Sequence, residues 1–189
     1  MPRRETPLLA GYHYHIYNRG HNGEPIFFAE ANYIYFLRQI RKYIMAEHGS
    51  VIAYALMPNH YHLLLRAETD QLSSAMQRLG ISYTKAINKA FARTGSLFQG
   101  AFQARLVECN EYLLHFSRYI HLNPVHGGLV SRPEAWVYSS YQDYLGLRHG
   151  TMPQPQVVLD QFQARGDYRC FVQAYLPDDR EATAKMLFD

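Results

Sequence analysis

The sequence predicts an α+β fold in which an antiparallel sheet carries helices on one face, and three observations lead to this fold class. The hydrophobic pattern runs in the order strand, helix, strand, strand, helix, strand, helix. This order is the split βαβ pattern of ferredoxin-like folds with one helix added. The composition, 48% hydrophobic and 19% charged over 189 residues, is typical of a folded globular chain. No apolar run approaches the length needed to cross a membrane.

The N-terminal part of this pattern is a strand followed by a helix. Residues 12–18 alternate and are rich in aromatic side chains, which favours a strand. This strand contains two histidines one residue apart, His13 and His15. Residues 30–48 carry apolar side chains at steps of three and four and precede Gly49, a typical helix stop. A helix is therefore expected over this range.

A second pair of histidines lies in the middle of the chain, where two antiparallel strands are expected around a turn at Pro58 and Asn59. Because side chains alternate along a strand, His60 and His62 should point to one face and Tyr61 to the other. Two neighbouring imidazoles can share a metal ion. The alternative is that both are solvated on the open face of a half-buried sheet. The pair at residues 13 and 15 is a rival metal site, ranked lower because it starts close to the N-terminus and lies next to no other ligand in sequence.

The next helix is expected at residues 70–93, with a buried apolar stripe and three basic residues on one face. Lys85, Lys89 and Arg93 lie four residues apart, so they share that face. A solvated surface is one interpretation of this face, and a track for a nucleic-acid backbone is the other. Asn18 and Arg19, at the end of the first strand, have the same two alternatives: a surface turn, or contact with a phosphate or a base edge.

A strand is expected within residues 97–108, and a third helix from Asn110 to about Leu122, because Pro124 disfavours continuation. Tyr119 and Asn123 are four residues apart and would share a face, with Asn123 at the C-terminal cap. Two imidazoles and an amide oxygen form a mixed ligand set that suits Mg²⁺ or Mn²⁺ acting with a phosphate substrate. A tyrosine beside such a site can be a covalent nucleophile. Tyr112, on the same helix, is the competing candidate.

The remaining features bound the class of protein. Residues 1–147 are expected to form the main domain, and residues 148–189, with weak periodicity, an appended extension. The net charge of +3 permits a phosphate-bearing partner without requiring one. Cys109 and Cys170 have no paired spacing, which argues against a disulfide scaffold and against a thiolate metal site. Together with an N-terminus that lacks a secretion signal, this favours a cytoplasmic protein.

Several of these motifs together resemble those of the HUH single-tyrosine transposases. The segments are 57–64, with the paired histidines, and 118–125, with the tyrosine and the asparagine before proline. Gly128, Pro133, Trp136 and the run 139–141 resemble the subgroup of REP-associated tyrosine transposases. The likeness covers roughly residues 10–147. One departure is His126, where the family often has a basic residue.

The resemblance implies a nuclease and strand transferase that acts on single-stranded DNA beside a REP-type hairpin. It assigns the metal ligands to His60, His62 and Asn123, and the nucleophile that becomes joined to a 5′-phosphate to Tyr119. The implied cofactor is Mg²⁺ or Mn²⁺, and the implied location is the nucleoid, as a monomer or homodimer. The side chains expected to contact DNA are Arg3, Arg4, Asn18, Arg19, Lys85, Lys89 and Arg93.

Three questions stay open at this level. The base that activates the tyrosine is not specified, and His121, Lys85 or a metal-bound water are the alternatives. A hairpin-binding regulatory protein without catalysis is the alternative function, which the presence of all the implied catalytic residues disfavours. A metallohydrolase of small phosphoesters is a third candidate, and it would need neither the basic helix face nor Tyr119.

Overall fold

The computed structural model describes residues 7–174, so two of the expected DNA contacts, Arg3 and Arg4, lie outside the described residues. The strands are β1 (His13–Arg19), β2 (Gly49–Met57), β3 (His60–Ala67) and β4 (Gln103–Val107). The longer helices are α1 (Glu30–Ile40), which continues as a π-helical turn at Arg41–Met45, α2 (Leu72–Ala90), α3 (Asn110–His126) and α6 (Arg165–Gln173). Shorter helices are α4 (Tyr141–Tyr144) and α5 (Gln156–Leu159).

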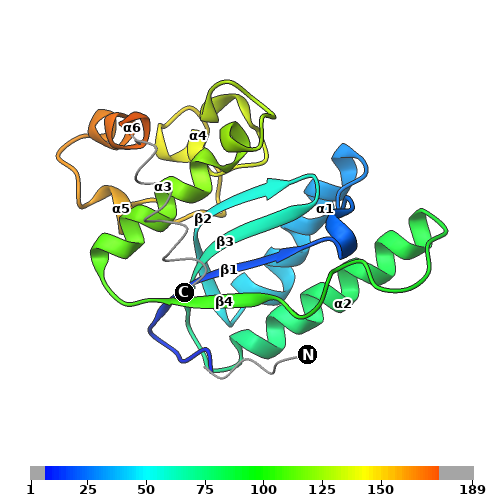
Figure 1. Ribbon diagram of the computed structural model, residues 1–189. Helices are drawn as coiled ribbons and strands as arrows, with labels where there is room; N and C mark the ends of the chain where they lie inside the picture. Colours follow the sequence, from blue (N-terminus) through cyan, green and yellow to red (C-terminus); the bar gives the residue numbers. More distant parts are fainter. Residues whose placement is uncertain (1–6, 175–189) are drawn as a thin grey trace.

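The four strands form one antiparallel sheet in the order β2-β3-β1-β4. The hairpin turn at Pro58 and Asn59 makes β2 and β3 neighbours, and the helical crossovers place β1 between β3 and β4 (Figure 1). This arrangement confirms the predicted α+β fold with an antiparallel sheet. The first strand, predicted at residues 12–18, is shifted by one residue, and β4 lies inside the range 97–108 within which a strand was expected.

One face of the sheet packs against α1 and α2 (Figure 1). Tyr61 points to this face and contacts Phe36 of α1, with ring centroids 5.0 Å apart. Tyr83 of α2 is fully buried in the same layer, where its hydroxyl donates to the carbonyl of Ile26 at 2.8 Å. The apolar stripes predicted for both helices therefore form the main core. Burying Tyr61 here turns His60 and His62 to the opposite face, as the alternation predicted.

The opposite face, which the sequence suggested was open, is covered by α3. Phe116 and Ile120 of this helix are buried against apolar residues of β2 and β3. The predicted end of the helix near Leu122 is wrong, because the helix continues through Pro124 to His126. Pro124 has no N–H to donate to the carbonyl of Ile120, but the turn continues past it, and the N–H of Gly127 donates to the carbonyl of Asn123 at 2.8 Å. Asn123 is consequently a helical residue and not a cap.

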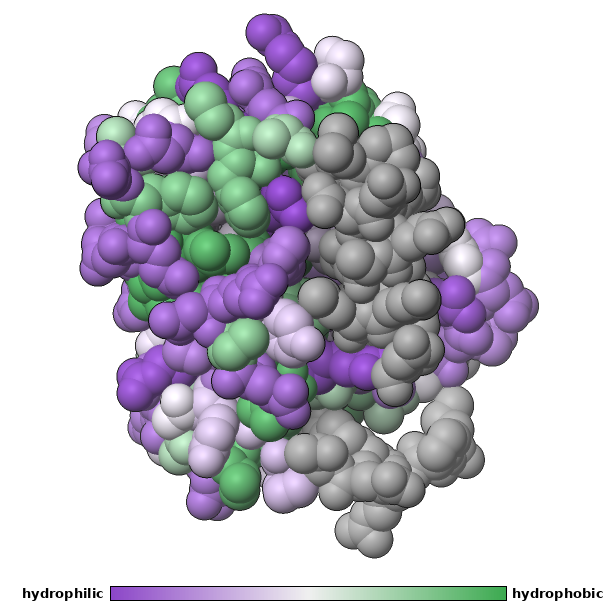
Figure 2. All heavy atoms as spheres, turned by 60° about the vertical axis from the view of Figure 1, so that its left-hand side comes forward, coloured by the Kyte–Doolittle hydropathy of each residue, from purple (hydrophilic) through white to green (hydrophobic). Residues whose placement is uncertain are grey.

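Residues 148–174 pack on the outer side of α3, with apolar residues of α5 and α6 in the second core. A buried polar network joins these parts. His121 of α3 bonds the Tyr168 hydroxyl of α6 at 2.7 Å through Nδ1 and the Ser140 hydroxyl at 2.8 Å through Nε2. The Tyr168 hydroxyl also donates to Ser117 at 3.1 Å. The outer face of this region, turned forward in Figure 2, mixes hydrophilic and hydrophobic residues, as expected for helices that bury only one side. The division at residue 147 stays a prediction.

Candidate active site

The candidate site is centred on two histidines that β3 presents to α3. The rings of His60 and His62 stand 5.1 Å apart between centroids and nearly perpendicular. His62 is 6% exposed, whereas His60, at the start of the strand, is half-buried. Because successive side chains of a strand alternate faces, His60 and His62 lie on the same face of β3, and the strand alone is enough to hold the two rings side by side.

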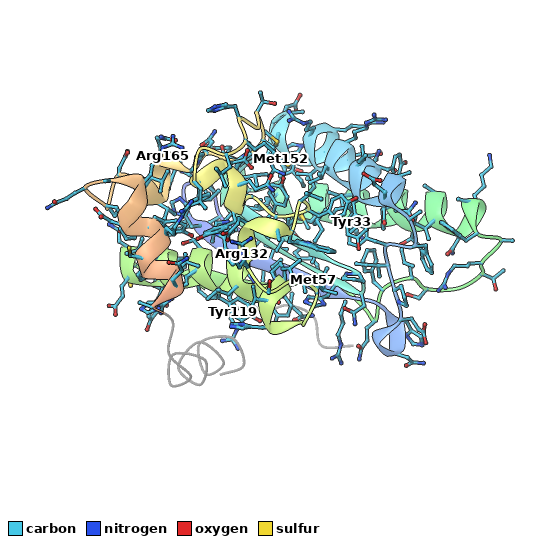
Figure 3. The ribbon with its side chains drawn as sticks, turned by 90° about the horizontal axis from the view of Figure 1, so that it is seen from above. Tyr33, Met57, Tyr119, Arg132, Met152 and Arg165 are labelled. Carbon is cyan, nitrogen blue, oxygen red and sulfur yellow. The ribbon has the colours of Figure 1, made fainter. Side chains whose placement is uncertain are left out.

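Helix α3 brings a tyrosine and an amide to the same pair. The Tyr119 ring stands edge-on to His62, with centroids 5.3 Å apart. Asn123, one turn further on, places its Oδ1 atom 3.3 Å from His60 Nε2. Its Nδ2 atom donates to the carbonyl of Tyr119 at 3.1 Å, which fixes the orientation of the amide. In Figure 3, Tyr119 and Met57, the residue paired with His60, lie toward one side of the molecule, and Met152 and Arg165 toward the other.

The hydrogen bonds around His60 make a cation a good fit here. Nδ1 of His60 lies 2.7 Å from Oδ1 of Asn59, an acceptor, so Nδ1 carries the hydrogen of the neutral ring. Nε2 then holds a lone pair that faces a second acceptor, Oδ1 of Asn123. Two acceptors facing each other are unfavourable without a donor or cation between them. The residues therefore suit a metal ion held by two imidazoles and one amide oxygen.

No group of three or more His, Cys, Asp or Glu side chains within residues 7–174 is placed to hold a metal ion. The set described above contains an amide oxygen, a neutral ligand, in place of a third such residue. Neutral ligands leave the full charge of a divalent ion to be balanced by a phosphate substrate.

Burial keeps the imidazoles of this site uncharged. It lowers the pKa of His60, and the Asn123 carbonyl oxygen, which can accept a hydrogen from Nε2 only when the ring is protonated, partly offsets this effect. The pKa of His62 is lowered well below its usual value, first by burial and then by the neighbouring His15 and His60. Neutral imidazoles carry the lone pair that metal binding requires.

A third histidine, His15 of β1, lies beside His62 on the same face. Its Nε2 atom is 2.9 Å from Nδ1 of His62, and the residue is fully buried. The sequence-based interpretation includes His15 only as part of a rival pair. The signal that identifies it is the same alternation: β1 lies next to β3, so His15 faces the layer that also holds His62. His13, the other member of that pair, is paired with Arg66 at the far end of β3.

We expect the folded protein to be sensitive to mild acid. Burial lowers the pKa of both His15 and His121 to about 3, against about 6.5 in the unfolded chain. Between these values the unfolded state binds two protons that the folded state does not, so stability falls as the pH falls. The expected loss is small above pH 6.5 and approaches about 1.4 kcal/mol per pH unit for each histidine at lower pH. Urea unfolding followed by circular dichroism at pH 7.5, 6.5 and 5.5 measures it. The variant His15→Gln should show a shallower decline, and equal stability at all three pH values would contradict the assignment.

Two of the alternatives that the sequence left open for the base that activates Tyr119 are wrong. His121 is fully buried on another side of α3, where Tyr168 and Ser140 occupy both ring nitrogens. Lys85 lies on α2, which packs on the opposite face of the sheet. For the nucleophile, Tyr119 makes the ring contacts with His15 and His62, whereas Tyr112 packs at the margin of the second core.

The expected DNA contacts fall into separate places. Arg19 is exposed at the end of β1 and is paired with His60 in the sheet, so it borders the site. Asn18 is 8% exposed, and its amide bonds the carbonyl of Gly100 and the backbone N–H of Arg19, which gives it a structural role in the loop. Lys85, Lys89 and Arg93 follow α2 and the turn after it, behind the sheet as seen from the histidines.

Fold and site together define a class: α+β proteins in which a helix sets a tyrosine against a histidine pair on an antiparallel sheet. The chain belongs to the family described as "Transposase IS200 like", which matches residues 9–123. The matched range contains all four strands and most of α3. It therefore includes the four central residues of the site, which are His60, His62, Tyr119 and Asn123. No helix within the described part of the chain is long and apolar enough to pass through a membrane.

Among solved structures, sixteen chains match this one. One has the description "Structure of the REP associates tyrosine transposase bound to a REP hairpin". It is 18% identical, has a TM-score of 0.67, and the alignment covers 77% of this chain and 86% of that chain. At this identity the likeness shows the fold. No curated protein matches the sequence.

Proposed function

We propose that the protein is a metal-dependent endonuclease and strand transferase that acts on single-stranded DNA beside REP-type hairpins through a covalent 5′-phosphotyrosine. The observation that carries this proposal is the position of Tyr119, whose ring lies 5.3 Å from that of His62 in a chain of the IS200-like transposase family. The choice of hairpin DNA is supported by the similar structure described as bound to a REP hairpin. Action on such DNA implies a place at the nucleoid in the cytoplasm.

In this proposal the ion, Mg²⁺ or Mn²⁺, would be held by His60, His62 and Asn123. When bound, it supplies Lewis acidity that offsets charge developing on a non-bridging oxygen of the scissile phosphate. The Asn123 amide is held in place by its bond to the Tyr119 carbonyl, so the ligand and the nucleophile move as one unit of α3. The partial burial of Tyr119 against imidazole rings restricts the directions from which its hydroxyl can meet a phosphate.

The chemical steps follow from the nucleophile. The Tyr119 oxygen bonds to phosphorus as its proton passes to water, the bond between phosphorus and the 3′-oxygen breaks in line, and the 3′-oxygen takes up a proton from water to leave as a hydroxyl. The product is a phosphotyrosine ester on the 5′ end of the DNA, which keeps the energy of the phosphodiester bond. A second 3′-hydroxyl can then reverse the attack and join the strands. All four central residues belong to one chain, so a monomer is sufficient for cleavage in this proposal.

The test is incubation of the full-length protein with end-labelled single-stranded hairpins and flanking sequence in the presence of Mn²⁺ or Mg²⁺. A protein–DNA band that survives denaturation is the expected result. If binding occurs but no adduct forms with either metal on any flanking sequence, the non-catalytic hairpin-binding function replaces this proposal.

We expect Arg19 to contribute a phosphate contact next to the cleavage site. It is exposed, and its Nε atom donates to Gln99, which holds the guanidinium at the end of β1. Arg19→Ala should weaken binding to single-stranded DNA and reduce the slope of log K against log salt by about 0.7. Fluorescence anisotropy between low and moderate salt measures both quantities.

Lys85→Ala is the matched comparison. Because α2 lies behind the sheet, the basic row at Lys85, Lys89 and Arg93 can only meet a part of the DNA distant from the scissile phosphate, such as a hairpin stem. We expect this change to leave binding of an unstructured oligonucleotide as it is. If the slope of log K against log salt is unchanged in Arg19→Ala, then Arg19 makes no phosphate contact.

A further inference from the structure

The buried contact between His15 and His62 has a consequence for metal binding. The two rings are nearly parallel, at 14°, and Nε2 of His15 lies 2.9 Å from Nδ1 of His62. His15 is also stacked on Phe116 of α3 and on Tyr17, with centroids 4.9 and 5.1 Å away. These contacts fix the ring on three sides. Nδ1 of His15 is buried and has no hydrogen-bond partner among the described residues.

Only one of the two facing nitrogens can carry the shared hydrogen, and the choice determines the state of His62. If His15 donates, neutral His62 must hold its own hydrogen on Nε2, the atom that a metal ion would need. If His62 donates from Nδ1, its Nε2 keeps a lone pair. His15 then holds its hydrogen on Nδ1, where it meets no acceptor within residues 7–174. A buried donor without an acceptor is unfavourable, so the first arrangement is favoured without an ion, and the second becomes necessary when an ion takes the Nε2 lone pair of His62.

We infer that His15 is a positioning residue that accepts the Nδ1 hydrogen of His62 and thereby keeps the Nε2 lone pair of His62 turned toward a divalent cation. The inference rests on the proposed metal site. Histidine ligands generally donate their second ring N–H to a carboxylate, a carbonyl or water, which fixes the tautomer. Here the acceptor is a neighbouring imidazole. The stacking of His15 between Phe116 and Tyr17 gives it the rigidity that this role requires.

Two variants separate hydrogen bonding from packing. His15→Phe keeps a flat ring for the stack but has no acceptor. His15→Gln loses the ring but its amide oxygen reaches about as far as Nε2 and can accept from His62. Isothermal titration of the full-length protein with Mn²⁺ is expected to show affinity lowered by about 10- to 100-fold in His15→Phe. The affinity of His15→Gln is expected to stay close to that of the wild type. Thermal unfolding of each variant confirms that it is folded.

A second readout does not depend on a measured affinity. Long-range ¹H–¹⁵N correlation spectra, recorded at a Mg²⁺ concentration that saturates the wild type, report which nitrogen of His62 carries the hydrogen. The expected result is Nδ1–H in the wild type and in His15→Gln, and Nε2–H in His15→Phe. The inference is overturned if His15→Phe keeps both the wild-type tautomer and the wild-type affinity, or if His15→Gln loses as much affinity as His15→Phe.

The same data distinguish this inference from the proposed function. A wild type that binds neither Mn²⁺ nor Mg²⁺ overturns the metal site and this inference with it. A wild type that binds Mn²⁺ and forms the DNA adduct, with His15→Phe unaffected in every measurement, leaves the function standing and overturns the role of His15.

Discussion

Tyr119→Phe is expected to abolish formation of the covalent adduct and to lower DNA cleavage by at least about 10³-fold, because the substitution removes the nucleophilic oxygen. The contacts with His15 and His62 are made by the ring of Tyr119, which phenylalanine preserves, so the fold and the position of α3 should persist. Binding to hairpin DNA is expected to stay within about twofold of the wild type, since one hydroxyl contributes little to affinity beside the phosphate contacts. Denaturing gels with end-labelled DNA measure cleavage, and anisotropy measures binding.

Tyr112→Phe is the matched control for this experiment. Tyr112 lies seven residues earlier, two turns along α3, and packs at the margin of the second core. Loss of the Tyr112 hydroxyl should leave DNA cleavage unchanged. If Tyr119→Phe still cleaves DNA without an adduct, water is the nucleophile, and the metallohydrolase interpretation is correct.

Removal of the metal, or of one of its imidazole ligands, has the second large expected effect. His62→Gln removes an imidazole from the site while keeping a side chain of similar length. Loss of charge stabilisation on the phosphate should lower adduct formation by about 10²- to 10³-fold, and excess EDTA should do the same to the wild type. Re-addition of Mn²⁺ should restore adduct formation in the EDTA-treated wild type but not in His62→Gln.

His21→Gln provides the control, because His21 is an exposed residue of the short turn that follows β1. Both variants should bind hairpin DNA, so a defect in cleavage is separable from misfolding. Adduct formation that is undiminished in EDTA would show that the imidazoles act without a metal ion, for example by hydrogen bonding to the phosphate.

Much of the site follows from a single sequence rule, the alternation of side chains along a strand. That rule alone turns His60 and His62 to one face, and Tyr61 into the core. The pairing of this face with Tyr119 cannot be obtained in that way, because α3 follows β3 by more than 40 residues and its docking depends on packing. The resemblance to a known family supplies it. The role of His15 escapes sequence analysis for the same reason: 47 positions separate it from His62 in the chain.

One error has a local physical cause. The prediction that proline ends α3 near Leu122 fails because a proline costs one hydrogen bond of the ladder, whereas the packing of α3 on the sheet continues to hold the helix. For the basic row of α2, charge alone suggests a DNA contact, but charge patterns contain no information about which face of a sheet a helix covers. Arg19, identified from its place at a strand end, does border the site, because strand register determines its neighbours.

The buried hydrogen bond between His121 and the Tyr168 hydroxyl joins α3, the helix that bears Tyr119, to α6 near the end of the described chain. A polypeptide shortened at residue 147 would retain every residue of the candidate site, yet it would remove the hydrogen-bond partner of His121 Nδ1 and expose the apolar residues of α3 that α5 and α6 cover. Such a fragment should aggregate or refold α3 in another position. Work with recombinant fragments is therefore best served by an end beyond α6.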